Sequence, residues 1–163
     1  MKRIGLLSDT HSYLHPNIFT HFAAVDEIWH AGDIGNLEVA DALEDFKPLR
    51  AVYGNIDGHE LRERYPKVNS FQIETLHVCM THIGGYPPRY NKFSKPIVRA
   101  HRPHLFISGH SHILKVMPDD ALNLLHMNPG ACGKVGFHKV QTLIRFEVHG
   151  SRMKNLEVIE LQK

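Results

Sequence analysis

The residues most able to do chemistry in this chain are carboxylates, histidines and one amide that sit in short polar clusters. The clusters contain Asp9, His11, Asp33, Asn55, His82, His110 and His112. Oxygen and nitrogen donors of this mixed type bind divalent metal ions, and seven of them exceed the needs of one tetrahedral ion. They suit two ions about 3.5–4 Å apart with one carboxylate bridging them. The set therefore predicts a dinuclear metal site.

The spacing within the clusters favours ligation. Side chains two positions apart lie on the same side of an extended segment, so Asp9 with His11, and His110 with His112, can point to one place. Glycines precede Asp33, Asn55 and His110, and we expect them to allow sharp backbone turns. A neutral asparagine keeps the charge of the donor set low, so that the site with its metal ions stays positive and attracts an anion.

Each cluster follows an apolar run that predicts a buried strand. These strands are expected at 3–7, 26–30, 49–53, 76–81 and 104–108. Because ligand sites lie outside the carboxyl ends of strands in α/β sheets, the five ends can converge on one crevice. Helices are expected at 16–24, 37–46 (with Asn36 as N-cap), 58–65 and 94–101.

The rest of the chain is mainly strand. Further strands are expected at 69–74, 113–117, 122–127, 139–149 and 152–160, and the last two can form a hairpin. The segment 83–93 is rich in glycine and proline and is predicted to be a loop. The summed prediction is an α/β (α+β) fold, a two-layer β-sandwich flanked by helices, as a single domain over 1–163.

Composition narrows the class of protein. With 163 residues, of which 42% are hydrophobic and 22% charged, the chain can bury a core and is not expected to be disordered. A net charge of +2 is too small to indicate stable nucleic-acid binding, and no apolar run is long enough to span a membrane. Two cysteines, Cys79 and Cys132, form no disulfide framework, which favours the cytoplasm. We interpret both as small buried residues.

The clusters, in this order, resemble the metal motifs of the calcineurin-like metallophosphoesterases. The motifs are Asp9-x-His11, Gly32-Asp33, Gly54-Asn55, His82 and Gly109-His110-x-His112. Asn128-Pro129-Gly130 also resembles the subgroup of small bacterial and archaeal phosphodiesterases, so the likeness extends over nearly the whole chain.

This resemblance implies roles for the seven residues. Asp9, His11 and His112 would bind one metal ion, Asn55, His82 and His110 the other, and Asp33 would bridge them. A water or hydroxide between the ions would attack phosphorus in line, with Asp33 and Asn55 also positioning the phosphate. Mn²⁺ is the ion we expect first; Zn²⁺, Fe²⁺ and Ni²⁺ remain alternatives.

The chain departs from the family pattern at the position after Asn55. Many members have a histidine there that serves the leaving group, whereas this chain has Ile56. Asp57 or His59 could replace it in part, although Asp57 is better interpreted as a residue that supports the ligands or makes a turn. The fifth motif continues Ile83-Gly84-Gly85 where many members have Gly-His. The absence of the first histidine favours substrates with a good leaving group.

Two further residues are candidates for the site. His30 could orient a ligand by a hydrogen bond, or it could bond the backbone at its strand end. Arg89, in the 83–93 loop, could grip a substrate phosphate, or it could be a solvated surface residue.

The function we expect is hydrolysis of small phosphodiesters, including nucleotides, by a dinuclear metal site. Three alternatives stay open: a scaffold or binding protein of the same fold, similar to the retromer subunit; a phosphomonoesterase; and a protein phosphatase, which the short chain disfavours. The exposed faces of the last strands leave a homo-oligomer open, without an argument from particular residues.

Overall fold

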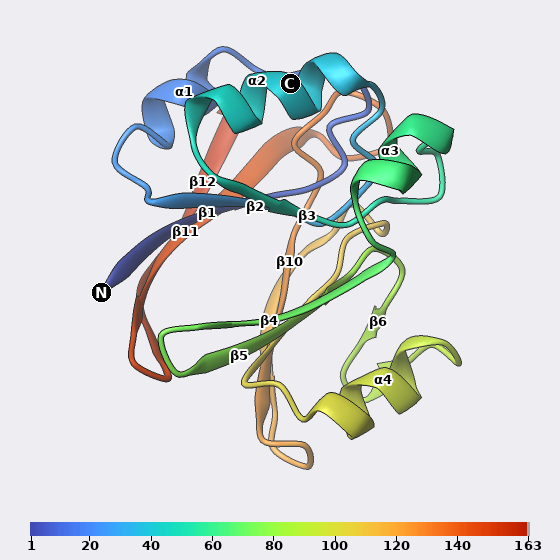
Figure 1. Cartoon of the computed structure of the whole chain (residues 1–163), viewed down its shortest axis with the longest axis vertical. Helices are drawn as coiled ribbons and strands as arrows, with labels where there is room; N and C mark the ends of the chain where they lie inside the picture. The colour runs from blue at the N-terminus through green and yellow to red at the C-terminus, as the bar shows by residue number, and fades with distance from the viewer. Residues whose placement is uncertain (163) are drawn as a thin grey trace.

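The computed structural model describes residues 1–162 and contains two five-stranded sheets that face each other (Figure 1). The first sheet has the order β12-β11-β1-β2-β3 and the second has the order β4-β5-β8-β10-β9. Figure 1 shows α1, α2 and α3 on the far side of the first sheet and α4 on the far side of the second. This architecture confirms the predicted α+β sandwich flanked by helices.

The first half of the chain builds most of the first sheet. Its elements are β1 (Lys2–Leu7), α1 (Asn17–His21), β2 (Glu27–His30), α2 (Leu37–Phe46), β3 (Leu49–Ala51) and α3 (His59–Arg64). Strands β1, β2 and β3 are parallel, so their carboxyl ends lie at one edge. Helix α2 has the predicted bounds, and the Asn36 side chain accepts a hydrogen bond from the Val39 amide.

The second half contributes the other sheet and completes the first. Its elements are β4 (Val68–Ile73), β5 (Leu76–Thr81), β6 (Gly85–Tyr86), β7 (Arg89–Tyr90), α4 (Ser94–His101), β8 (Leu105–Ile107), β9 (Leu114–Asp119), β10 (Leu124–Pro129), β11 (Val140–His149) and β12 (Arg152–Gln162). β5, β8 and β10 are parallel, and β11 and β12 form the predicted hairpin.

From its glycine and proline content we expected the segment 83–93 to be an irregular loop. Part of it is regular instead. It contains β6 and β7, a small antiparallel hairpin of its own. The Asn91 side chain accepts from the Ser94 amide and donates to the Ile83 carbonyl, and Ser94 donates to the Gly84 carbonyl. These bonds close the segment on itself, which single-residue propensities do not reveal.

Three apolar clusters hold the layers together. The central cluster lies between the sheets and includes Leu6, Trp29, Met80, Ile107 and Phe146. A second packs Ile18, Val39, Leu43 and Leu61 of the first three helices, together with Phe22 just after α1, onto the first sheet. A third packs Val98 of α4 against Cys79 and Phe106 of the second sheet. Both cysteines are buried and unpaired, and burial raises the pKa of each thiol.

None of the helices within residues 1–162 has the length and apolar character of a membrane-spanning segment.

Trp29 joins the two sheets, so its removal should destabilise the whole sandwich. The indole is fully buried, with edge-to-face contacts to Phe71 (5.0 Å) and Phe146 (5.6 Å). We expect Trp29→Ala to lower the free energy of unfolding by about 3–5 kcal/mol. Denaturant unfolding would measure this, with Phe137→Ala, which removes an exposed ring, as the control expected to change stability by less than about 0.5 kcal/mol. A loss below about 1 kcal/mol would contradict this account of the core.

Candidate metal centre

Five strand ends, three from the first sheet and two from the second, converge at one edge of the sandwich. Past the ends of β1 and β2, the backbone still pairs: the amides of Asp9 and His11 donate to the carbonyls of Gly32 and Asp33. In the second sheet, past the ends of β5 and β8, the Gly109 amide donates to the His82 carbonyl. This continued pairing fixes the loops that carry the predicted ligands.

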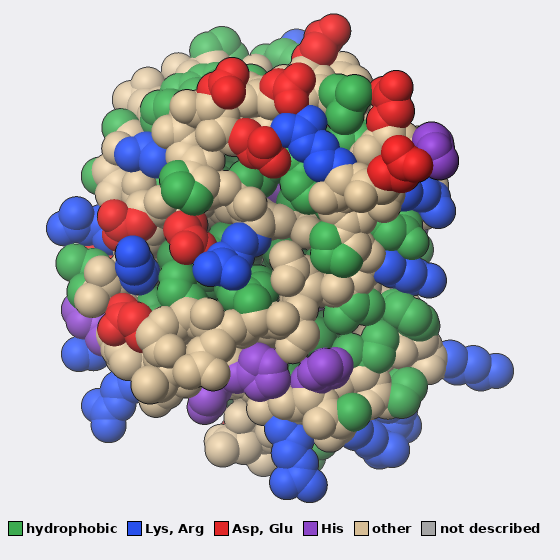
Figure 2. Space-filling view, viewed as in Figure 1, with side chains coloured by type: hydrophobic (Ala, Val, Ile, Leu, Met, Phe, Trp, Pro, Cys, Tyr) green, Lys and Arg blue, Asp and Glu red, His purple; other side chains and the backbone are tan. Residues whose placement is uncertain are grey.

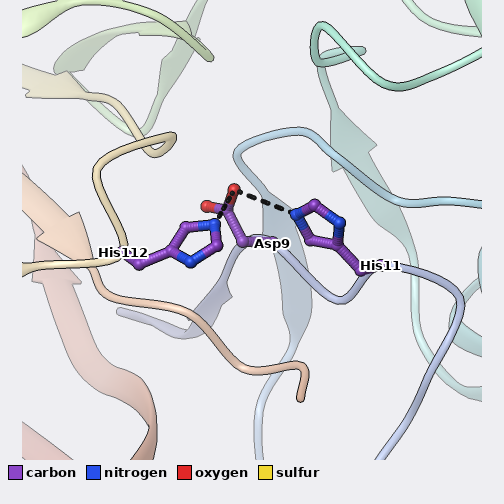
Figure 3. A group of neighbouring side chains, drawn as sticks. All are labelled: Asp9, His11 and His112. Atoms are coloured by element: carbon purple, nitrogen blue, oxygen red, sulfur yellow. Dashed lines mark ion pairs between the residues drawn. The ribbon is translucent and has the colours of Figure 1, made fainter. Parts of the chain in front are cut away.

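Asp9, His11 and His112 form the first group of facing side chains (Figure 3). The Asp9 Oδ1 atom lies 3.2 Å from His112 Nε2 and 3.8 Å from His11 Nε2. The other carboxylate oxygen, Oδ2, accepts from the Ser8 hydroxyl and from the His110 amide. One oxygen of Asp9 is therefore held in place while the other faces the histidines.

Asp33, His82 and His110 form the second group, with Asn55 beside it. The Asp33 Oδ2 atom lies 3.2 Å from His82 Nε2, and the His110 Nδ1 and Asn55 Oδ1 atoms are 3.0 Å apart. His82 places Nδ1 2.7 Å from the Ala31 carbonyl, so Nδ1 donates and Nε2 keeps its lone pair. This bond orients the ring as ligating histidines require.

Asp33 links the two groups. Its Oδ2 atom also lies 3.3 Å from His11 Nε2, so a single oxygen faces one histidine from each group. Its other oxygen accepts from the Ile56 amide. The structure thus brings together all seven residues predicted as ligands, with Asp33 in the central position.

The unpartnered atoms of this cluster fit a cation. Among the described residues, Asp9 Oδ1, His11 Nε2 and His82 Nε2 are buried and have no hydrogen-bond partner. Unpaired buried polar atoms are costly, and all three face the space between the carboxylates. A divalent ion in each group would satisfy them with the oxygen and imidazole donors that such ions accept.

The charges within the cluster support each other. Burial disfavours ionised Asp9, but His11 and His112 outweigh it and hold its pKa well below the usual range. Burial also disfavours ionised Asp33, but His82 outweighs this effect and lowers the pKa of the Asp33 carboxyl. In turn the Asp9 carboxylate raises the pKa of His11, and Asp33 raises that of His82 against the effect of burial. Both carboxylates are therefore ionised and available at neutral pH.

The backbone at the cluster adopts an uncommon conformation. Asp9, His11, Asp33, His110 and His112 all have positive φ, between 46° and 72°. Such values cost energy in residues other than glycine, although Asp and His tolerate them better than most, and they concentrate at functional sites. The sharp turns are thus made by the predicted ligands themselves, in addition to the glycines.

Gly54 is needed for a different reason from the one expected. Its φ is not positive, but a Cβ atom there would overlap the Asp33 carboxylate. The glycine before Asn55 therefore permits close approach of two loops, whereas Gly32 has a φ of 101° and does make a turn.

His30 acts on the backbone and not on a predicted ligand. It is fully buried, accepts from the Gly32 amide through Nδ1, and places Nε2 3.0 Å from the Thr10 hydroxyl. Burial lowers its pKa to about 4, so the ring is neutral. The structure therefore supports the second interpretation, in which His30 bonds the backbone at its strand end. The ring links the loops after β1 and β2.

Neither substitute for the missing acid lies where it could act. The Asp57 carboxylate is buried and accepts from three backbone amides, those of Ile34, Gly35 and Gly54. It therefore ties the loop after β2 to the loop after β3, and the expectation that it acts catalytically is not supported. His59 is exposed on α3 and pairs with Glu63 at 3.0 Å.

Arg89 is exposed on β7 and does not line either cavity beside the cluster. Three other cations do: Arg62 and Lys67 line one cavity, and Lys115 lines the other. Sequence reasoning missed them because no motif marks them. The Arg62 guanidinium donates to the carbonyls of Asn55 and Asp57, which holds the loop that carries Asn55.

The fold and this cluster define a metallophosphoesterase-type domain. The family model of the calcineurin-like phosphoesterase superfamily domain matches residues 1–151, and the chain belongs to this superfamily. Relatives are a "probable metallophosphoesterase" of Methanocaldococcus jannaschii, 32% identical over 78% of this chain and 67% of its own length, and one of Methanothermobacter thermautotrophicus, 31% identical over 78% and 76%.

Solved structures share the fold at low sequence identity. Vps29 of Chaetomium thermophilum superposes with a TM-score of 0.77 at 13% identity, covering 99% of this chain and 97% of its own. A Streptococcus pneumoniae protein described as a predicted phosphoesterase gives 0.72 at 20% identity, covering 98% and 89%. Vps29 of Entamoeba histolytica, described as complexed with zinc, gives 0.73 at 15% identity, covering 98% of both chains.

Replacing Asp57 should destabilise the loops that carry the predicted ligands, although Asp57 is not itself a predicted ligand. In Asp57→Asn the amide nitrogen cannot accept, so at least one of three backbone amides loses its partner. We expect a loss of about 1–3 kcal/mol in unfolding free energy and weaker divalent-ion binding. Denaturant unfolding and calorimetric titration with Mn²⁺ measure the two effects. Asp45→Asn, on the exposed side of α2, is the matched control, and equal behaviour of the two variants would refute the assigned role.

Protonation of His30 should destabilise the fold. Because its pKa is about 4 when folded and near 6.5 when unfolded, the unfolded chain binds the proton first as pH falls. Its stabilising contribution is full above pH 6.5 and declines toward pH 4, by up to about 3 kcal/mol. Comparing unfolding of the wild type and His30→Gln across this range should show a shallower decline in the variant. Parallel curves would contradict a neutral buried His30.

Proposed function

We propose that this chain is a metal-dependent phosphodiesterase that acts on small diesters through two divalent ions. The observation that carries the proposal is the position of Asp33, whose Oδ2 atom faces His11 and His82 from two separate groups at 3.3 and 3.2 Å. A carboxylate shared in this way suits two adjacent ions better than one. Membership of the calcineurin-like phosphoesterase superfamily supports phosphoester hydrolysis as the reaction class.

The residues would divide the work by their positions. Asp9, His11 and His112 would hold one ion, and Asn55, His82 and His110 would hold the other, with Asp33 between them. Bound divalent ions lower the pKa of a coordinated water toward about 7 and neutralise charge on phosphate oxygens. The Mn²⁺ ion remains our first choice for a set that mixes carboxylate and imidazole donors.

The chain's own residues supply orientation more than proton transfer. Ile56, 47% exposed, stands where a leaving-group acid would be expected, and Asp57 and His59 are engaged elsewhere. The departing group must then leave without strong protonation, so diesters of acidic alcohols or phenols should react best. This feature favours diester over monoester hydrolysis, because monoesters of ordinary alcohols need that proton more.

A scaffold role is the second candidate, since several structural neighbours are Vps29 proteins. The observation against it is the donor set, in which all seven predicted ligands are present and face one another. A purely structural domain has no need for three buried, unpartnered donor atoms.

Hydrolysis of bis(p-nitrophenyl) phosphate by metal-stripped protein, with Mn²⁺, Ni²⁺ or Zn²⁺ added back, tests the proposal. We expect turnover only with added ion, and a loss of about 100-fold or more in kcat/KM for Asp33→Asn and for His82→Ala. His101→Ala, an exposed histidine on α4, is the matched control and should retain full activity. The monoester p-nitrophenyl phosphate should be the poorer substrate.

Calorimetric titration of the same proteins separates the two candidates. Two bound ions per chain without turnover of any aryl ester would favour the scaffold. Turnover that does not depend on added ion, or that survives in both variants, would refute a dinuclear mechanism.

A further inference from the structure

Two cavities lie beside the candidate metal centre and share one wall. The first, about 310 Å³, is lined by Tyr53, Asn55, Lys67, His82, Ile83 and Phe93 among others. The second, about 220 Å³, is lined by Ile83, Tyr86, His110, Ile113, Lys115 and Asn128 among others. Ile83 and Asn91 line both cavities; the first cavity reaches Asn55 and His82, and the second reaches His110.

The shared wall is held in place. Asn91 donates to the Ile83 carbonyl and accepts from the Ser94 amide, and Ser94 donates to the Gly84 carbonyl. These bonds fix the segment that separates the cavities and that carries Tyr86 and Phe93. The two spaces are therefore features of the fold and not gaps between loose side chains.

Each cavity is lined by the same pair of side chains, a partly exposed aromatic residue with a lysine over its ring. In the first, the Lys67 amine lies 4.1 Å from the centre of the Phe93 ring, and in the second the Lys115 amine lies 3.6 Å from that of Tyr86. Phe93 and Tyr86 remain 39% and 42% exposed, so both residues are accessible to a ligand. Base–aromatic stacking of this kind is worth about 1–3 kcal/mol per base.

The charge of both cavities favours an anionic ligand with more than one contact. None of the described residues that line either cavity is Asp or Glu, whereas Arg62, Lys67 and Lys115 are cationic. Figure 2 shows Asp and Glu gathered over α2 and α3 at the top of the viewed face, and Lys and Arg around the half that carries α4. An anion therefore meets favourable charge on the α4 side.

We propose that the two cavities receive the two arms of a dinucleotide-type diester, with one ring-bearing arm against Phe93 and the other against Tyr86. This inference rests on the proposed function, since the phosphate between the arms would lie at the predicted metal ligands. Each volume suits one ring. A monoester would fill only one of the two.

Calorimetric binding tests the proposal without turnover. The probes are phosphorothioate-linked dithymidine, which is hydrolysed slowly and carries two arms; thymidine 5′-monophosphate, with one arm; and inorganic phosphate, with none. Each is titrated into Zn²⁺-loaded wild type, Phe93→Ala, Tyr86→Ala and the control Phe137→Ala, whose ring is exposed and lines neither cavity.

We expect the dithymidine probe to bind the wild type more tightly than the monophosphate does. Phe93→Ala and Tyr86→Ala should each weaken dithymidine binding about tenfold, and only one of them should weaken monophosphate binding. Phosphate binding should change less than twofold in every variant. Phe93→Leu, which keeps bulk without a flat ring, should behave as the alanine variant does.

Three results would overturn the proposal. They are equal wild-type affinities for dithymidine and the monophosphate, full dithymidine affinity in both alanine variants, and an equal loss of phosphate affinity in those variants. Metal-dependent hydrolysis of bis(p-nitrophenyl) phosphate would persist in each case if the proposed function holds. Failure of the function itself would instead appear as wild-type protein that binds no ions or hydrolyses no diester.

Discussion

Two buried carboxylates close together are the constraint on which the rest of this edge of the molecule depends. Asp9 and Asp33 would repel each other and lose hydration unless positive or donor groups surround them. Histidines from both sheets meet that need, and backbone amides hold the remaining oxygens. The convergence of five strand ends, the positive φ values and the close approach at Gly54 all serve to bring those partners within reach.

Local patterns in the sequence were enough to predict most elements and the composition of the candidate site. The bounds of α2 and α4 are as expected, and for α2 the Asn36 cap and the apolar spacing are local signals. The seven predicted ligands lie together because each follows a strand that could be recognised by itself. The class of sandwich followed from the order of these elements.

Long-range features could not be predicted in this way. The insertion of β11 between β1 and β12, and the hairpin of β6 and β7, depend on partners that no local pattern names. The same holds for Asp57, whose three amide partners lie in two loops, and for Arg62, Lys67 and Lys115, which become neighbours of the site only when the chain is folded. Arg89, the cation that the sequence singled out, lines neither cavity.

The origin of the donor atoms in both sheets couples ion binding to the assembly of the sandwich. Asp9, His11, Asp33 and Asn55 come from the first sheet, and His82, His110 and His112 come from the second. A cation held by this set would bridge the sheets and bind only the folded chain, so part of its binding free energy becomes folding free energy. The ions would then hold the two sheets together as well as take part in the chemistry, and the melting temperature would rise with ion occupancy.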